Sequence, residues 1–212
     1  MKDQEHIIRT YNATAESYAA TRIDELSAKP LDRILLREFA SINLGKGKCA
    51  DFGCGPGHAT KFLHDNGMTD IVGIDISPEM VNTAKKYFPD IAFETGNLLE
   101  LSHQDECFSS AIAFYAIVNF DHDQLTTALK EVRRVLKSGA ELLLSFHVGE
   151  GVVHFDKARD IDVDVDMYFW KLDTMVELLA NSGFEVITAL ERLPYVPVEY
   201  NSKRGYISAR RR

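Results

Sequence analysis

Three glycines at alternating positions follow an acidic residue, and this pattern suggests chemistry more directly than any other in the sequence. Asp51 precedes Gly53, Gly55 and Gly57, between a short apolar run and a helical pattern that begins at about Ala59. Glycine permits positive φ and lets a ligand approach the backbone, while the amino end of a helix offers unpaired N–H groups. The pattern predicts a loop that binds a polar ligand, and a tight turn without a ligand is the alternative.

The spacing within this loop narrows the class of ligand. The dinucleotide-binding fingerprint has its third glycine at position 58, where this sequence has His58. The loop that cradles nucleotide phosphates ends in Gly-Lys-Ser or Gly-Lys-Thr, which this segment lacks. An acidic residue followed by alternating glycines is the pattern that remains.

This first motif and three further segments resemble the class I S-adenosylmethionine-dependent methyltransferases, small-molecule type, with a methyltransferase type 11/25-like domain. Residues 73–77 (GIDIS) are similar to the family's second motif, and residues 94–98 (ETGNL) to its third-strand motif. Residues 131–141 are similar to the segment that the family writes as V-L-K-P-G-G, with Ser138 and Ala140 replacing Pro and Gly. The resemblance implies S-adenosylmethionine as cofactor and S-adenosylhomocysteine as product.

Asp75 is the strongest single candidate within these motifs. It follows the apolar run from Ile71 to Ile74, and a carboxylate at a strand tip can accept two hydrogen bonds from a ribose diol. The alternative role is to cap the next helix. Ser77 and Pro78 already make a good helix start, so a capping Asp75 would be redundant.

The resemblance extends the expected cofactor site to both sides of Asp75. Asn97 stands where family members usually have Asp, and its amide can still contact the adenine edge. Tyr11 and Tyr18 are seven residues apart on one helical face, and the resemblance implies that they close over the methionine part of the cofactor. Packing of these rings on the core is the alternative. The expected cofactor-binding residues are Tyr11, Tyr18, Asp51, Gly53, Cys54, Gly55, Gly57, Asp75, Ile76, Asn97 and Leu98.

Catalytic residues are harder to assign, because the sulfonium of the cofactor is already a strong electrophile. The protein must mainly align the acceptor with the methyl group and exclude water. A hydroxyl or protonated amine acceptor also needs a base. His147 and Tyr115 follow two predicted strands and are candidates for that role, and each could equally be structural or shape the substrate pocket.

No metal site is predicted. The spacing of His147, Glu150, His154 and Asp156 matches no metal site that we can justify. The alternating acids at 160, 162, 164 and 166 lack the glycine and glutamate that a calcium loop requires. Their alternation with apolar residues suits an edge strand with one solvated face.

The elements that must position these residues alternate between strand and helix. The predicted strands are 48–52, 71–74, 91–93, 111–115 and 141–146, after a helical segment from His6 to about Phe39. A helix over 171–181 and extended segments 184–190 and 205–209 follow. We expect a Rossmann-like three-layer α/β sandwich with a seven-stranded, mostly parallel sheet, an antiparallel last strand and an N-terminal helical cap. One domain spans 1–212, with the cap at 1–44, the cofactor-binding core at 45–147 and a substrate-side segment with closing strands at 148–212.

Composition limits the partners. The formal charge of −8 provides no overall positive field for a nucleic acid, and no stretch approaches the length of a membrane-spanning helix. We expect a cytoplasmic protein, monomer or homodimer, whose acceptor is a small molecule methylated on O, N or C. The alternatives are an NAD(P)-dependent oxidoreductase and a catalytically silent cofactor-binding module. Glu199 and Arg204, near the C-terminus, could line the acceptor pocket or pair as exposed charges of little energetic weight.

Overall fold

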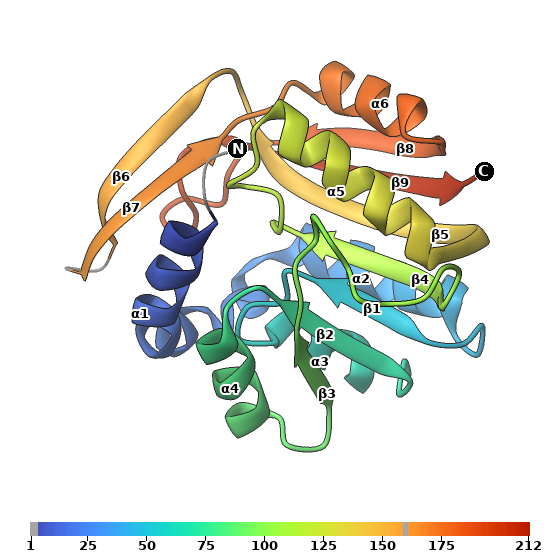
Figure 1. The fold of residues 1–212 in the computed structure, drawn as a ribbon, viewed down its shortest axis with the longest axis horizontal. Helices are drawn as coiled ribbons and strands as arrows, with labels where there is room; N and C mark the ends of the chain where they lie inside the picture. Colours follow the sequence, from blue (N-terminus) through green and yellow to red (C-terminus); the bar gives the residue numbers. More distant parts are fainter. Residues whose placement is uncertain (1–3, 159–160) are drawn as a thin grey trace.

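The computed structural model describes residues 4–158 and 161–212 and contains a seven-stranded sheet (Figure 1). Its strand order is β3-β2-β1-β4-β5-β9-β8, and β9 is antiparallel to both of its neighbours. The prediction of a mostly parallel sheet closed by an antiparallel last strand is confirmed. The strands are β1 (Cys49–Phe52), β2 (Ile71–Asp75), β3 (Ala92–Thr95), β4 (Phe108–Phe114), β5 (Leu136–Val148), β8 (Phe184–Arg192) and β9 (Lys203–Arg211).

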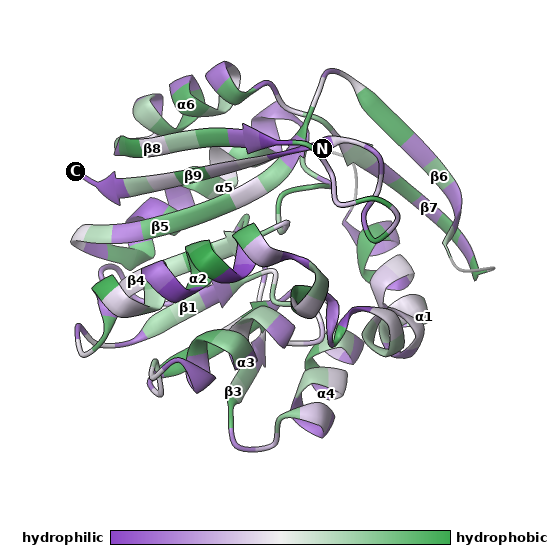
Figure 2. Ribbon diagram, turned by 180° about the vertical axis from the view of Figure 1, so that it is seen from behind, coloured by the Kyte–Doolittle hydropathy of each residue, from purple (hydrophilic) through white to green (hydrophobic). Residues whose placement is uncertain are grey.

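Helices cover both faces of the sheet and create two apolar cores. On one face lie α2 (Pro30–Asn43), α3 (His58–Asp65) and α4 (Pro78–Tyr87), which are in front in Figure 2. On the other lie α5 (His122–Val135) and α6 (Leu172–Asn181). β1, β2 and β4 are buried almost completely, because both of their faces are covered.

The helix starts that follow the strands are fixed by local chemistry. Gly57 has φ of 86° directly before α3, and Ser77 caps α4 by accepting a hydrogen bond from the Met80 N–H. Asp121 and Gln124 form a capping box at the start of α5. Each turn therefore leaves its strand at a defined point, which aligns the carboxyl ends of the central strands along one edge of the sheet.

Two elements stand over that edge. The cap consists of α1 (Glu5–Arg22), a short 3₁₀ helix (Glu25–Ala28) and α2, and α1 packs against α4 and the second strand of a separate hairpin. This hairpin pairs β6 (Val152–Ala158) with β7 (Ile161–Tyr168) and leans away from the main sheet beside α1 (Figure 1). The strand predicted over 160–166 therefore exists, although Asp160 lies outside the described residues and the partner strand β6 was not expected.

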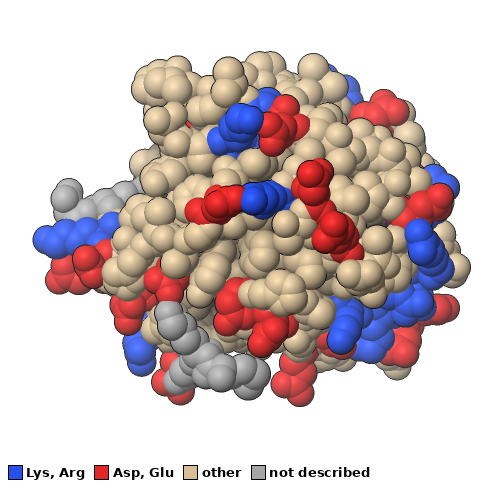
Figure 3. All heavy atoms as spheres, turned by 90° about the horizontal axis from the view of Figure 1, so that it is seen from above, with Lys and Arg blue, Asp and Glu red and all other residues tan. Residues whose placement is uncertain are grey.

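The described surface mixes charges of both signs. Figure 3 shows Lys and Arg interspersed with Asp and Glu on the face seen from above. Among the residues of the structural description, no helix is both long and apolar enough to span a membrane.

Candidate functional site

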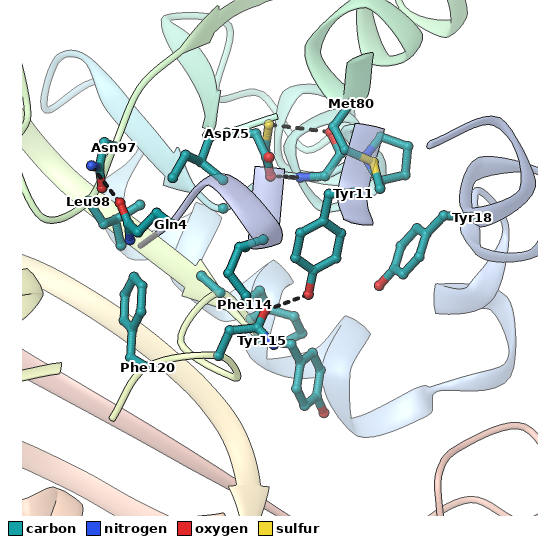
Figure 4. A pocket seen from close by; sticks show the side chains of 18 of the residues that line it. Gln4, Tyr11, Tyr18, Asp75, Met80, Asn97, Leu98, Phe114, Tyr115 and Phe120 are labelled. Carbon is teal, nitrogen blue, oxygen red and sulfur yellow. Dashed lines mark hydrogen bonds between the residues drawn. The ribbon is translucent and has the colours of Figure 1, made fainter. Parts of the chain in front are cut away.

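A cavity lies at the carboxyl ends of β1, β2 and β4, under the cap helix α1 (Figure 4). Its empty volume is about 1110 Å³, counting the solvent at its open mouth. Most residues predicted to bind a cofactor line it, although they come from four separate segments of the chain. These residues are Tyr11, Tyr18, Gly53, Cys54, Gly55, Asp75, Ile76, Asn97 and Leu98.

Asp75 lines this cavity and is held by the backbone. Its Oδ2 accepts a hydrogen bond from the Gly55 N–H (2.8 Å), and its Oδ1 accepts one from the Ser77 N–H (2.9 Å). Burial raises the pKa of the carboxyl group, and these backbone donors act in the opposite direction. Each oxygen keeps a further lone pair, so the carboxylate can accept two hydroxyl hydrogen bonds from a ribose. The residues present therefore suit an adenosyl group.

The glycine loop divides into a ligand face and a packing face. A Cβ on Gly55 would meet nothing within 4 Å, whereas one on Gly57 would lie 2.7 Å from the Phe93 ring. Gly57 therefore lets the loop pack on the core and does not line the cavity. Asp51 also lies below the loop, fully buried, where its Oδ2 accepts a hydrogen bond from Thr60 Oγ1 (2.6 Å). Burial raises the pKa of Asp51 to about 7.

His58 joins the loop to the cap. Its Nε2 lies 3.0 Å from Glu25 Oε1, in the 3₁₀ helix of the cap. Burial opposes ionisation of Glu25, but hydrogen bonding to His58 and the nearby charges of His58, Lys29 and Arg22 together lower its carboxyl pKa. The position that holds a glycine in the dinucleotide fingerprint thus carries a side chain that anchors the cap.

One end of the cavity gathers polar and apolar groups suited to a purine. Figure 4 shows Gln4, Asn97, Leu98 and Phe120 together at this end. Asn97 Oδ1 accepts a hydrogen bond from the Leu99 N–H (2.9 Å), and Asn97 Nδ2 donates one to Gln4 Oε1 (2.7 Å). These two bonds fix the orientation of the Asn97 amide. Gln4 and Phe120 were not predicted as site residues: Gln4 belongs to no motif, and Phe120 is only the last residue of the segment 109–120 that corresponds to the family's fourth strand and its loop.

The cap reaches the other end through α1. Tyr11 and Tyr18 both line the cavity, and the Tyr11 hydroxyl donates to Asn119 Oδ1 (2.6 Å) after β4. Burial raises the pKa of Tyr11, so its hydroxyl stays protonated. Asn12 Oδ1 accepts a hydrogen bond from Ser77 Oγ (2.7 Å). The cap therefore contacts the loops that follow β2, β3 and β4.

A second cavity adjoins the first. Tyr11, Tyr18, Glu25 and Tyr115 line both cavities, and His147 belongs to the second alone. Asp166 lines the first cavity, although the alternation of acids along its strand predicted that it would lie on the solvated face. Its Oδ1 lies 2.8 Å from His154 Nδ1, across the hairpin.

Tyr115 lines both cavities, and its hydroxyl belongs to a buried polar group. The hydroxyl lies 3.1 Å from the Tyr206 hydroxyl and 3.3 Å from Asp32 Oδ1, in a buried polar group. Burial, followed by the charge of Asp32, raises its pKa well above the ordinary value. The backbone at this strand tip has φ of 59°, which a residue other than glycine rarely adopts.

His147 is a neutral imidazole whose Nδ1 faces a hydroxyl group. Burial, with the charges of Arg204 and Lys29, lowers its pKa to about 3. Its Nδ1 lies 2.8 Å from Ser202 Oγ, which accepts a hydrogen bond from Arg204 Nη1 (2.7 Å). The Ser202 hydroxyl can donate its own proton to Nδ1, which puts the ring proton on Nε2. In that form His147 offers a hydrogen-bond donor.

An ion cluster of seven side chains lies beside the second cavity, and four of its members line it. Arg192 donates two hydrogen bonds to Glu199 (2.7 and 2.9 Å) and one to Asp32 (2.8 Å). Of the two roles considered for Glu199 and Arg204, an exposed pair is wrong, because both side chains are buried and Glu199 pairs mainly with Arg192, while Arg204 lines the second cavity. The members, which join the cap to the β8–β9 connection, are Arg22, Glu25, Lys29, Asp32, Arg192, Glu199 and Arg204.

Comparison with known proteins agrees with this geometry. A family model described as a methyltransferase domain matches residues 50–139. The chain is similar to the ubiquinone/menaquinone biosynthesis C-methyltransferase of Campylobacter jejuni, with 31% identity over 153 residues. The match covers 68% of this chain and 64% of that protein, so the chain spans less than two thirds of this relative.

Solved structures share the fold. A crystal structure of an S-adenosylmethionine-dependent methyltransferase from Methanosarcina mazei superposes with a TM-score of 0.73 at 21% identity, covering 81% of this chain and 95% of that one. A glycopeptide N-methyltransferase solved with S-adenosylmethionine superposes with a TM-score of 0.66 at 16% identity, covering 84% and 92%.

The sequence motifs, the family model and the fold agree on one cofactor, S-adenosylmethionine. The alternative of an NAD(P)-dependent oxidoreductase is set aside by the same findings. The chain belongs to the class I S-adenosylmethionine-dependent methyltransferase family.

Proposed function

We propose that this protein transfers the methyl group of S-adenosylmethionine to a small-molecule acceptor bound in the second cavity. The observation that carries the proposal is the pair of adjoining cavities, which share the walls formed by Tyr11, Tyr18, Glu25 and Tyr115. Asp75, the proposed ribose acceptor, lines the first cavity, and residues of the cap and of the β8–β9 connection line the second. Two ligands can thus meet at the shared walls.

The cofactor supplies a positively charged sulfonium with a transferable methyl group. Asp75 would hold the ribose diol, Asn97 and Leu98 the adenine, and Gly53 to Gly55 the backbone side of the cofactor. Tyr11 and Tyr18 would close over its methionine part. Asp51 and Gly57 support the loop from below.

The transfer needs orientation more than acid–base catalysis. The acceptor atom forms a bond to the methyl carbon while the carbon–sulfur bond breaks, and the electron pair of that broken bond passes to sulfur, which gives S-adenosylhomocysteine. A hydroxyl or amine acceptor gives its displaced proton to water. In this proposal the raised pKa of Tyr115 and the lowered pKa of His147 suit neither residue to proton removal at neutral pH. Tyr115 forms the wall between the cavities, and His147 donates a hydrogen bond to the acceptor.

The names of the relatives raise a second candidate, C-methylation of a quinone ring. The observation that favours it is the aromatic wall of the second cavity. The His147 ring lies with its centroid 5.7 Å from that of Tyr115 and 6.0 Å from that of Tyr200. These rings suit a planar acceptor, whether a quinone or another aromatic small molecule.

Binding measurements test the cofactor assignment first. S-adenosylhomocysteine at about 100 times its dissociation constant should stabilise the protein by about 2.7 kcal/mol, whereas NAD should not. Stabilisation by NAD alone would overturn the proposal. Transfer of a labelled methyl group to members of an acceptor panel then tests activity, and any transfer excludes a silent binding module.

A further inference from the structure

The second cavity carries charges that the first does not. Its empty volume is about 810 Å³, counting the solvent at its mouth. Arg22, Lys29 and Arg204 line it together with one carboxylate, Glu25, although the chain as a whole carries a net charge of −8. A cationic wall in an acidic protein indicates selection for a ligand of opposite charge.

We propose that the second cavity binds an aromatic carboxylate, with the carboxylate held by Arg204 and the ring against His147 and Tyr200. The inference rests on the proposed function, because it names the class of acceptor. The ring then extends from Arg204 toward the walls shared with the cofactor cavity, and the carboxylate is the anchor at its far end.

The charges of the ion cluster do not balance internally. Four cations, Arg22, Lys29, Arg192 and Arg204, face three carboxylates, Glu25, Asp32 and Glu199. His147 adds no positive charge, because its pKa lies at about 3. Apart from Arg22, which is 29% exposed, the side chains of the cluster are at most 10% exposed, so unbalanced positive charge is unfavourable and one additional anion is favourable there.

Arg204 is the cation best prepared to hold that anion. Its side chain is 4% exposed, and it is fixed by hydrogen bonds to the Ser202 backbone oxygen, the Ser202 hydroxyl and the Tyr200 backbone oxygen. Glu199 Oε1 lies 3.7 Å from its Nε, beyond hydrogen-bond distance. The guanidinium has five N–H groups: both on Nη1 and one on Nη2 are used, and the Nε–H faces Glu199, so one Nη2 N–H remains for a carboxylate oxygen.

Arg22 adds positive charge at the same cavity. Its Nη1 is paired with Glu25 (2.8 Å), and its side chain is 29% exposed. An anion in the cavity is therefore attracted by this guanidinium as well as by Arg204. The carboxylate of the cofactor's methionine part is a second anion that these cations can attract, so the test separates the two.

The ring preference follows from the remaining walls. His147, Tyr115 and Tyr200 line the cavity, and their rings meet at centroid distances of 5.7 and 6.0 Å. Met167 and Val118 add apolar surface. Edge-to-face contacts between such rings favour a flat aromatic ligand over a flexible chain of the same volume.

The experiment compares acids with their amides on protein saturated with S-adenosylhomocysteine. The probes are 4-hydroxybenzoate, 1-hydroxy-2-naphthoate and the two corresponding carboxamides, each titrated by calorimetry. Saturation removes the cofactor's own carboxylate as a source of the signal. We expect at least one acid to bind about tenfold to a hundredfold more tightly than its amide, because the amide lacks the charge that Arg204 pairs with.

Variants assign the effect to Arg204. In Arg204→Met the preference for the acid should disappear while S-adenosylhomocysteine binds as before. The matched control is Arg210→Met, which removes an exposed arginine from the same strand and should leave the affinity for both ligands unchanged. If Arg204→Met does not fold, Arg204→Lys replaces it. The acid–amide comparison on the unmodified protein still decides whether the cavity prefers a carboxylate.

Three results would overturn the inference. The first is equal affinity for acid and amide, and the second is undiminished acid binding in folded Arg204→Met. The third is binding of a neutral quinone such as menadione without binding of either acid. Failure of S-adenosylhomocysteine to bind the unmodified protein would instead overturn the proposed function. The two failures are therefore distinguishable.

Discussion

Replacement of Asp75 by alanine should weaken binding of S-adenosylhomocysteine by about a hundredfold or more. The carboxylate keeps one lone pair on each oxygen for the ribose diol, beyond the bonds from the Gly55 and Ser77 N–H groups. A hydrogen bond to a charged group contributes about 1.5–3 kcal/mol, so the loss of two costs at least about 3 kcal/mol. At room temperature this corresponds to about 150-fold in the dissociation constant.

The unliganded protein should change much less. Alanine leaves the Gly55 and Ser77 N–H groups without an acceptor, but it also removes a carboxylate whose burial is unfavourable, as its raised pKa indicates. These effects oppose each other. We therefore expect Asp75→Ala to fold, with a melting temperature within a few degrees of the original.

Isothermal titration with S-adenosylhomocysteine is the decisive assay. Asp75→Asn keeps one oxygen and should weaken binding by an intermediate factor. Asp65→Ala removes an exposed carboxylate from α3 and should leave binding unchanged. If folded Asp75→Ala binds within about threefold of the unmodified protein, the ribose assignment is wrong.

Three further predictions concern stability and protonation. Gly57→Ala should lower the free energy of unfolding by about 2 kcal/mol in urea titrations, because φ is 86° and the added Cβ would contact Phe93. His147 should not titrate between pH 5 and 8 in NMR spectra, because its pKa in the folded protein is about 3. This pKa lies below the unfolded value of 6.5, so the contribution of His147 to stability is lost as the pH falls from 6.5 toward 3. Burial opposes ionisation of Glu199, but pairing with Arg192 outweighs it and lowers the pKa from 4.5 to about 2, so this stabilisation is complete above 4.5 and lost toward pH 2. Glu199→Gln should therefore be less stable at pH 7 and show a shallower acid dependence in urea unfolding measured across that range.

The sheet could be predicted because its information is local. Short apolar runs indicated the five parallel strands, four of them within three residues of their observed bounds, while β5 begins five residues earlier than predicted. The hairpin could be predicted only in part. Along β7 the alternation of acids was visible, but β6 mixes polar and apolar residues without a clear turn signal before it.

The site could be predicted where a motif encodes it and not where tertiary contacts create it. Asp75 follows a strand and lies in the cavity, whereas Gln4 reaches Asn97 only because α1 docks on α4. Asp51 is the opposite case, because it belongs to a motif but supports the loop from below and does not line the cavity. The pairing of Arg192 with Asp32, 160 positions apart, has no trace in local sequence.

The cap helix contributes Tyr11 and Tyr18 to both cavities at once, and this has a kinetic consequence. While α1 is displaced to admit the first ligand, the second cavity lacks two of its walls. Substrate addition should then be ordered, with S-adenosylmethionine entering first and the methylated product leaving before S-adenosylhomocysteine. Product-inhibition patterns would display that order: S-adenosylhomocysteine would compete with S-adenosylmethionine, and the methylated product would compete with neither substrate.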